Sequence, residues 1–215
     1  PYTTLFRSQP LEHDRRIMPN QLAISSINVV VSADENTTAA TDRPVTPNEL
    51  ETLGVTDDFL AASRFEGNVN QTALLPEQDA VVIAVGLGNE ETTTATGRSS
   101  AAALWHASKH LDSLTSLLPL TIASELGAEV ALQAVVEGML LASYRYDELK
   151  GTPETAPNLQ QITLVVPDGV DSTAVLKKAA AVAAAIALSR DLVNRPGGSL
   201  SATQLANEAT TVADN

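Results

Sequence analysis

The chain has 215 residues, of which 44% are apolar and 18% charged, a composition typical of a globular protein and not of a disordered one. Its net charge of −13 would repel a phosphate backbone, which argues against nucleic acid as a partner. The absence of cysteine excludes disulfides, thiolate zinc sites and a cysteine nucleophile.

The first residues do not read as part of the fold. Residues 1–8 (PYTTLFRS) look like the in-frame translation of a sequencing adapter, whereas Met18 reads as a natural start. A real disordered tail is the alternative. We therefore set residues 1–17 aside as a non-native or disordered leader.

Nothing in the sequence resembles a secretion signal or a membrane span. The N-terminus lacks a basic segment followed by an apolar one. The longest nearly apolar run, residues 179–188, has about half of the ~20 residues that a span needs. We expect a soluble, cytoplasmic protein with no membrane partner.

The first half of the chain predicts strands, with one short helical region. Residues 24–32 (ISSINVVVS) are typical of a strand and residues 33–47 of a loop. Residues 48–64 show helical spacing in short pieces, and residues 68–75 predict another strand. Residues 80–85 (AVVIAV) form a continuous apolar run, which predicts a strand buried on both faces.

The middle of the chain alternates between helical and extended patterns. Residues 99–114 predict a helix, 117–123 a strand, and 128–149 a long helix with small residues on one face. Gly138 lies within that helix, where glycine costs up to ~1 kcal/mol relative to alanine, so we expect a close backbone contact there. Residues 159–166 predict a further strand.

Capping signals mark two helices near the C-terminus. Asp171 or Ser172 is expected to cap an alanine-rich helix that runs to about Asn194. Ser201 followed by Gln204 matches a capping box and predicts a last helix. The alternation of strands and helices predicts an α/β fold with three layers, in which a mixed or mostly parallel sheet lies between helices.

Gly86-Leu87-Gly88 follows a predicted strand and could let backbone amides approach a phosphate. The third glycine of the nucleotide-binding pattern would fall at Glu91, whose charge would repel phosphate. The sequence therefore favours a plain strand-ending turn.

Two histidines form the other candidate site. His106 and His110 are four residues apart, where two imidazoles on one helix face could share a metal. The second position of a zincin helix is Ala107 here, and no third ligand is implied nearby. Solvated or packing histidines are the favoured interpretation.

The remaining polar residues do not form a recognisable catalytic set. Ser199 and Ser201 are interpreted as turn and cap residues, since no nucleophile-elbow pattern exists. The acidic pairs, Asp57 with Asp58 and Asp147 with Glu148, are interpreted as solvated ends of elements. We therefore predict no catalytic, metal-binding or cofactor-binding residue in this chain.

Four segments resemble the leucyl (cytosol) aminopeptidase family. They are FEGNVNQTALLP (65–76), VVIAVGLG (81–88), EGMLLASYRYDELK (137–150) and ALSRDLVNRPGGSLSATQLANEA (187–209), of which the last is the most specific. The segment departs from the family at Gly197-Gly198, where Pro-Asn is more frequent. The likeness covers residues 24–215.

The resemblance implies an N-terminal α/β domain, a connecting helix and the start of a catalytic domain. We expect these at residues 18–168, 169–195 and 196–215. Family members assemble as hexamers and remove N-terminal residues from peptides with two divalent metals, zinc or manganese. Because no position matches the family's metal ligands, this chain is expected to be an inactive fragment that binds no metal.

Two other classes of protein remain open. A free-standing module like the macro domains would bind ADP-ribose, with Gly86 to Gly88 as its contact. A structural interaction protein would use the alanine-rich helix segment at residues 179–188 as its interface.

Overall fold

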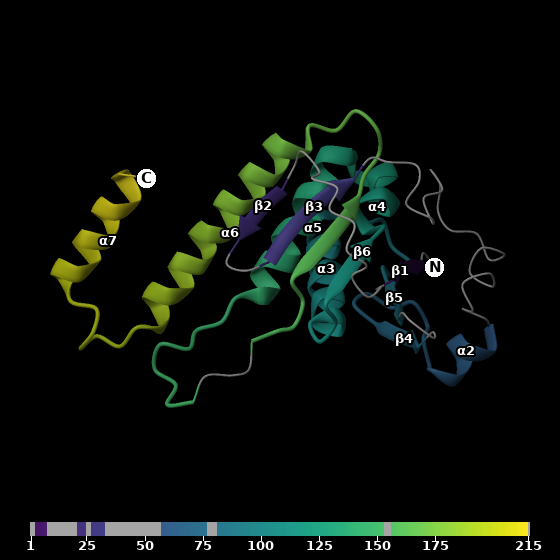
Figure 1. Ribbon diagram of the computed structural model, residues 1–215, viewed down its shortest axis with the longest axis horizontal. Coiled ribbons are helices and arrows are strands. Elements are labelled where there is room, and N and C mark those ends of the chain that lie inside the picture. Colours follow the sequence, from purple (N-terminus) through teal and green to yellow (C-terminus); the bar gives the residue numbers. More distant parts are fainter. Residues whose placement is uncertain are drawn as a thin grey trace.

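The computed structural model describes residues 3–7, 21–24, 27–32, 57–76, 81–152 and 156–214. Their centre is a seven-stranded sheet with the order β2-β3-β7-β6-β1-β5-β4 (Figure 1). The strands are β1 (Thr3–Arg7), β2 (Gln21–Ile24), β3 (Ile27–Ser32), β4 (Thr72–Pro76), β5 (Val81–Gly86), β6 (Ser113–Ser116) and β7 (Gln161–Val165).

The sheet is mixed, as predicted. β3, β7 and β6 run parallel to one another, whereas β2 pairs antiparallel with β3. β1 pairs antiparallel with both β6 and β5, and β4 pairs antiparallel with β5. The strand expected at residues 24–32 is confirmed as β3, whereas Ile24 belongs to a separate strand, β2, which pairs with β3.

Strand β1 differs from the sequence analysis, which left residues 1–17 out of the fold. Thr3–Arg7 lies between β5 and β6, with Leu5 opposite Ala84 and Phe6 opposite Ser116. The segment TTLFR is rich in residues that favour strands, which is a local reason for its conformation. The proposed foreign origin of this segment stays a prediction.

Strand β5 is buried on both faces, as its apolar run predicted. On one face, Ile83 and Val85 belong to the main core together with residues of the helices. On the other face, Val82 and Ala84 pack with Phe65 and, at the edge of that cluster, Phe59 of α2 (Asp57–Ala62). Helical residues therefore pack against both faces of β5.

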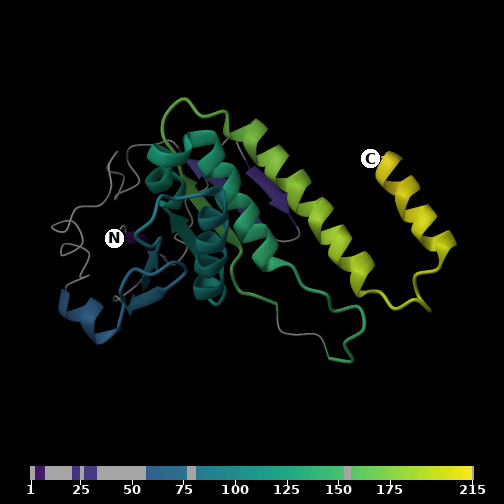
Figure 2. The ribbon, with the colours of Figure 1, turned by 180° about the vertical axis from the view of Figure 1, so that it is seen from behind.

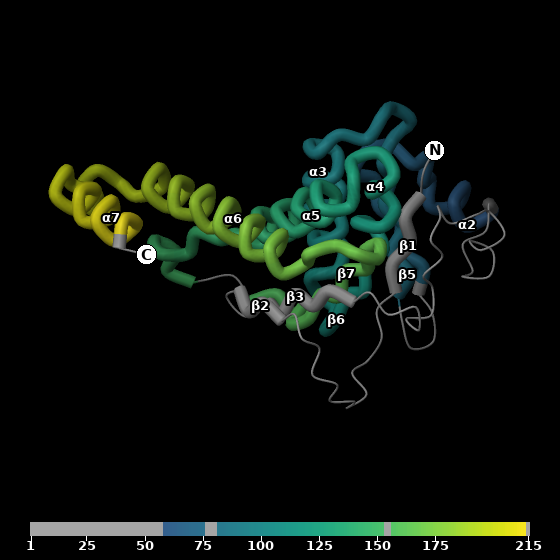
Figure 3. Tube along the Cα trace, turned by 90° about the horizontal axis from the view of Figure 1, so that it is seen from above, coloured from purple at the N-terminus to yellow at the C-terminus, as the bar shows by residue number. Residues whose placement is uncertain are grey.

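Helices α3 (Thr94–Ser108), α4 (Leu118–Leu126), α5 (Ala128–Ser143) and α6 (Ser172–Asn194) lie on one side of the sheet (Figure 3). Leu104, Ile122, Leu132 and Leu176, one from each helix, are at most 2% exposed and belong to one core cluster with strand residues. The α/β class and the mixed sheet are confirmed.

The boundaries of α3 differ from the predicted range of 99–114. The helix begins at Thr94, because the side chain of Thr93 accepts a hydrogen bond of 3.1 Å from the amide of Thr96. It ends at Ser108, and Ser113–Ser116 forms β6 instead of a last helical turn. The sequence analysis did not recognise Thr93 as the cap, because four threonines lie between residues 92 and 96.

The strand predicted at residues 117–123 is wrong, because this segment forms most of α4. Pro119 lies in the first turn, where a helix needs no amide donor. Leu118 and Ile122, four residues apart, are both buried on one helical face. A short apolar run fits either a strand or a buried helix, and Pro119 was the local signal that favoured the start of a helix.

Helix α5 confirms the expected close contact at Gly138. An added Cβ there would lie 2.9 Å from Ala101 Cβ and 2.9 Å from the carbonyl carbon of Arg98, both on α3. Ala131, Ala134 and Val135 are also buried on α5. The small-residue face therefore lets two helix backbones pack closely.

The caps predicted for the last two helices are confirmed. The Asp171 side chain accepts from the Ala174 amide at 3.1 Å and starts α6. Before α7 (Ala202–Asp214), the Ser201 amide donates to Gln204 Oε1 at 2.6 Å, and the Gln204 amide donates to Ser201 Oγ at 3.4 Å. Both ends of the capping box are therefore formed.

Helix α6 is long and apolar enough to cross a membrane by length and composition alone. It packs on α5 through Val175, Leu176, Ala179 and Ala183. Its C-terminal half extends past the sheet toward α7 (Figure 2). Burial of Ala179 and Ala183 in the core indicates that part of the alanine-rich face packs within the chain.

Candidate functional site

The glycine turn after β5 is closed by hydrogen bonds within the chain. The Gly86 amide donates to the Gln71 carbonyl at 2.8 Å, and the Gly88 amide donates to the Gly67 carbonyl at 2.9 Å. Gly88 has a φ of +83°, which favours glycine. Because both amides already have partners, they are not available to a phosphate, and the strand-ending turn is confirmed.

The two candidate histidines do not share a helix face. His106 is exposed on α3, but α3 ends at Ser108 and His110 lies in the turn beyond it. The His106 ring packs edge-on against Trp105, with 5.1 Å between ring centroids. Within the described residues, no three His, Cys, Asp or Glu side chains gather where they could hold a metal ion.

Two acidic residues after α5, Asp147 and Glu148, form ion pairs with basic side chains. Asp147 forms ion pairs with Arg145 and with Lys150, the latter at 2.9 Å. Glu148 accepts from Tyr146 at 3.2 Å. The acidic pair at Asp147 and Glu148 is therefore part of a local structural network rather than a solvated end.

We expect the pKa of Asp147 to lie below its ordinary value of 3.8, because Lys150 donates to the carboxylate; partial desolvation opposes this effect and the charge of Arg145 adds to it. The ionised carboxylate therefore stabilises the fold above pH 3.8, and this contribution is lost as the pH falls through the lower folded pKa. In an NMR titration, Lys150→Ala should raise the Asp147 midpoint. Lys178→Ala, on the exposed side of α6, should not change it.

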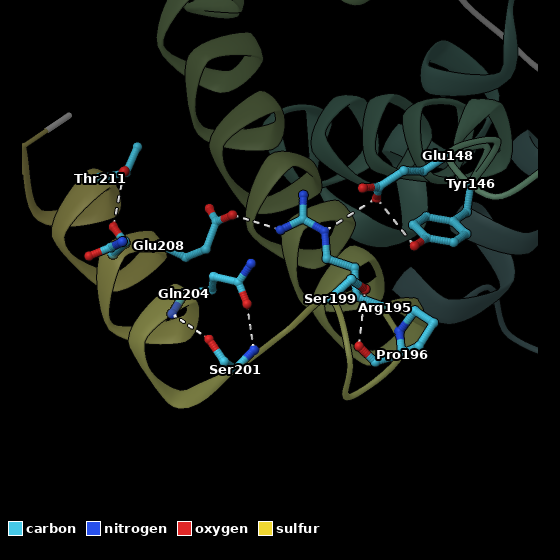
Figure 4. A network of polar contacts seen from close by, with 10 residues as sticks. Tyr146, Glu148, Arg195, Pro196, Ser199, Ser201, Gln204, Glu208 and Thr211 are labelled. Atoms are coloured by element: carbon cyan, nitrogen blue, oxygen red, sulfur yellow. Dashed lines mark hydrogen bonds and ion pairs between the residues drawn. The ribbon is translucent and has the colours of Figure 1, made fainter.

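Arg195 connects three segments that are distant in the sequence (Figure 4). Its Nε donates to Glu148 at 3.3 Å, and its Nη1 donates to Glu208 of α7 at 2.7 Å. These two hydrogen bonds raise the pKa of Arg195. Because most other residues of α7 are exposed, Arg195 holds α7 near the end of α6.

The turn between these helices explains the neighbouring serines. Ser199 Oγ donates to the Pro196 carbonyl at 3.0 Å, and Ser201 is the cap already described (Figure 4). The interpretation of both serines as turn and cap residues is confirmed.

A second cluster joins the end of α5 to α6. Tyr144 OH donates to Asp191 at 2.6 Å, and Asn194 Nδ2 donates to Tyr144 OH at 3.4 Å. Arg190 lies over the Tyr144 ring at 5.3 Å and donates to the Leu141 carbonyl at 3.1 Å. Partial burial raises the pKa of Tyr144, and the hydrogen bond with Asp191 adds to this shift.

A cavity of about 540 Å³ lies beside this cluster, between α5 and α6. Its lining is mostly aliphatic, with Ala183, Ala187 and Leu188 of α6 facing Leu140 of α5. Asp191 carries the only carboxylate among the described lining residues, and it already accepts from Tyr144. This cavity therefore lacks paired groups for acid–base chemistry.

Sequence reasoning did not find the contacts of Arg195 or Tyr144. Each contact joins residues that are between 13 and 50 positions apart, and no local pattern encodes such a pair. The described part of the chain thus has organised structural junctions but no assembled catalytic group.

A family model for the N-terminal domain of the cytosol aminopeptidase family matches residues 30–153. A probable cytosol aminopeptidase of Roseiflexus castenholzii is 32% identical over 196 residues, covering 85% of this chain and 40% of that protein. A probable cytosol aminopeptidase of Geotalea uraniireducens is 34% identical over 160 residues, covering 69% of this chain and 32% of that protein. The chain thus spans well under half of the length of these relatives.

Solved structures show the same similarity. The bottromycin maturation enzyme BotP superposes with a TM-score of 0.62 and 28% identity, over 87% of this chain and 37% of that one. A mutant of tomato leucine aminopeptidase superposes with a TM-score of 0.69 and 19% identity, over 96% of this chain and 44% of that one. The latter likeness supports the fold alone.

Proposed function

Because the chain belongs to the cytosol aminopeptidase family and matches the N-terminal domain of that family, we propose that it is the non-catalytic N-terminal part of a metal-dependent leucyl aminopeptidase. The whole protein would remove N-terminal amino acids, leucine among them, from peptides. The match over residues 30–153 carries this proposal, supported by the 32% identity to a probable cytosol aminopeptidase.

The whole enzyme would use two divalent metals, manganese or zinc. Such metals activate a bridging water and stabilise the charge of a tetrahedral intermediate. One structurally similar enzyme, BotP, is described in complex with Mn, which supports manganese as a candidate. The described residues do not fit such a centre, since they offer no group of three His, Cys, Asp or Glu side chains. We therefore assign no metal ligand and no catalytic step to this chain.

The parts of the chain would divide as the sequence suggests. Residues 18–168 would form the N-terminal domain, 169–195 a connecting helix, and 196–215 the start of the catalytic domain. The Arg195 and Tyr144 contacts support a structural role for the connecting helix, because they attach it at its C-terminal end to α5 and α7. We further propose a cytoplasmic homo-hexamer, and the description of both relatives as probable cytosol aminopeptidases supports the cytoplasmic location.

We expect the purified chain to release no product from leucine p-nitroanilide with either Mn²⁺ or Zn²⁺. The physical reason is the absence of a metal-ligand set among the described residues. Release is followed by absorbance, with the Roseiflexus castenholzii relative assayed in parallel as the positive control.

Circular dichroism should first show that the assayed chain is folded. Turnover that depends on added metal, and that EDTA abolishes, would contradict the proposal that this chain is non-catalytic. A relative that does not release product under any metal condition would contradict the proposed activity of the whole enzyme.

A further inference from the structure

The second half of α6 carries an apolar stripe on the side that faces away from the core. Four apolar residues recur there at intervals of four, three and four positions: Ala181, Ala185, Leu188 and Leu192. This spacing places them on one side of the helix, opposite to the side that packs on α5. Ala181 and Ala185 are exposed, and the two leucines are only half-buried.

Helix α7 carries a second stripe of the same kind. Leu205, Ala209 and Val212 are spaced by four and three positions, so they share one side of the helix. Leu205 is 48% exposed and Val212 is 56% exposed. A helix of 13 residues is marginal in water unless an apolar side packs on a partner. The stripe on α7 therefore requires a partner that the described part of the chain does not supply.

The charged residues of this region already interact within the chain. Residues 179–213 contain four charged side chains, namely Arg190, Asp191, Arg195 and Glu208. Arg190 lies over the Tyr144 ring, Asp191 accepts from Tyr144, and Arg195 pairs with Glu208. The region thus has no net charge, although the chain carries −13. Depletion of free charge is typical of the core of a protein–protein interface.

Three kinds of partner could cover the two stripes: a membrane, a second copy of the chain, or further polypeptide of a longer protein. Val175 and Leu176 hold the first half of α6 in the core, so the helix is not free to enter a bilayer as a whole. A second copy would have to associate against the −13 charge of each chain. The matched relatives are more than twice as long as the part that this chain covers. A covalently attached segment acts at high effective concentration, which favours the third partner.

We propose that the two stripes, together called the α6–α7 surface, form the docking surface for the catalytic part of the whole aminopeptidase. The docking surface rests on the function proposed above, because its partner is the remainder of that enzyme. Arg195 contributes by linking Glu148, after α5, to Glu208 of α7, which holds α7 beside the end of α6 (Figure 4). In the whole enzyme, Leu205 and Val212 would be buried.

Hydrogen exchange followed by mass spectrometry tests this surface. In the chain alone, which light scattering should show to be a monomer, the amides of α7 should exchange much faster than those of the buried helix α5. In the whole Roseiflexus castenholzii relative, the helix equivalent to α7 should exchange about 100-fold more slowly than α7 does. Burial of one or two large apolar side chains accounts for a factor of this size.

Substitutions provide the matched comparison. In the chain alone, Leu205→Ser should leave the urea midpoint unchanged, because Leu205 has little to pack against, whereas Leu104→Ala in the core should lower it. In the whole relative, serine at the position equivalent to Leu205 should speed exchange of that helix at least tenfold. Serine at the position equivalent to Asn207, on the opposite side of α7, should leave exchange unchanged.

Slow exchange of α7 in the monomeric chain overturns the proposal, since the surface would then already be covered. A dimer that protects α7 overturns it in favour of a second copy, and co-sedimentation of the chain with phosphatidylcholine vesicles overturns it in favour of a membrane. An active relative whose equivalent helix exchanges as fast as α7 overturns the docking surface and leaves the proposed function intact. A relative that protects this helix but releases no product from leucine p-nitroanilide supports the docking surface and contradicts only the proposed activity.

Discussion

Replacement of Gly86 by alanine should lower the free energy of unfolding by about 3 kcal/mol, the upper part of the range for overpacking a core. A Cβ at this position would lie 2.6 Å from the carbonyl carbon and oxygen of Gly67, and still closer to the Asn68 carbonyl oxygen. These are backbone atoms in a turn held by the Gln71–Asn68 hydrogen bond of 3.0 Å. They cannot rotate aside as the end of a side chain would.

The measurement is urea unfolding followed by the fluorescence of Trp105, which is buried in the same core. For a chain of this length, about 3 kcal/mol corresponds to a fall in Tm of roughly 6–12 °C. Gly151→Ala is the control, because a Cβ there would meet nothing within 4 Å. A Gly86→Ala variant as stable as that control would falsify the packing explanation of this glycine.

The outcome also bears on the rival function. If Gly86 served a nucleotide such as ADP-ribose, its substitution would affect ligand binding more than stability. Glycine is required at residue 86 because a Cβ there would meet the Gly67 and Asn68 backbone, and at residue 88 because its φ is +83°. Calorimetry with ADP-ribose is therefore expected to show no binding at this turn.

The sequence predicted those elements whose signals lie within a few residues. The apolar run of β5 indicated its burial on both faces, and Asp171 correctly marked the start of α6. The capping box of Ser201 and Gln204 also formed as predicted. Each of these features depends on neighbours in the chain, so a linear pattern contains the necessary information.

The failures come from ambiguous local patterns and from tertiary contacts. The apolar run at residues 117–123 suits a strand or a buried helix, and packing of Leu118 and Ile122 into the core favours α4. The sheet partners of β1 and the long-range contacts of Tyr144 and Arg195 depend on how distant segments meet. Sequence spacing alone does not specify such pairs.

The candidate sites divide in the same way. The glycines at residues 86 and 88 form the strand-ending turn that the sequence favoured, whereas the absence of phosphate binding there stays a prediction. The sequence analysis assumed that both histidines lie on one continuous helix. In the structure α3 ends at Ser108, before the second histidine. The cavity between α5 and α6 was missed, since it forms only when residues of the two helices come together.

Replacement of Gly138 by alanine should also destabilise the protein, although alanine is the better helix former. Helix propensity alone would stabilise the variant by up to ~1 kcal/mol. Against this, the added Cβ would contact the Arg98 carbonyl oxygen on the facing helix and lie 2.9 Å from Ala101 Cβ. Overpacking costs about 1–3 kcal/mol, so we expect a net loss of about 1–2 kcal/mol in urea unfolding.

Gly97 on α3 is the matched control, since it is a buried helix glycine in the same group of packed helices. Its added Cβ would meet the Ile122 Cδ1 atom at 3.0 Å, the far end of a flexible side chain that can move. Propensity and crowding should then nearly cancel, and Gly97→Ala should change stability by less than about 1 kcal/mol. Equal losses in both variants would mean that general crowding, rather than backbone approach at Gly138, limits the packing of α3 on α5. A larger loss at Gly138 would show that the backbone contact itself requires glycine.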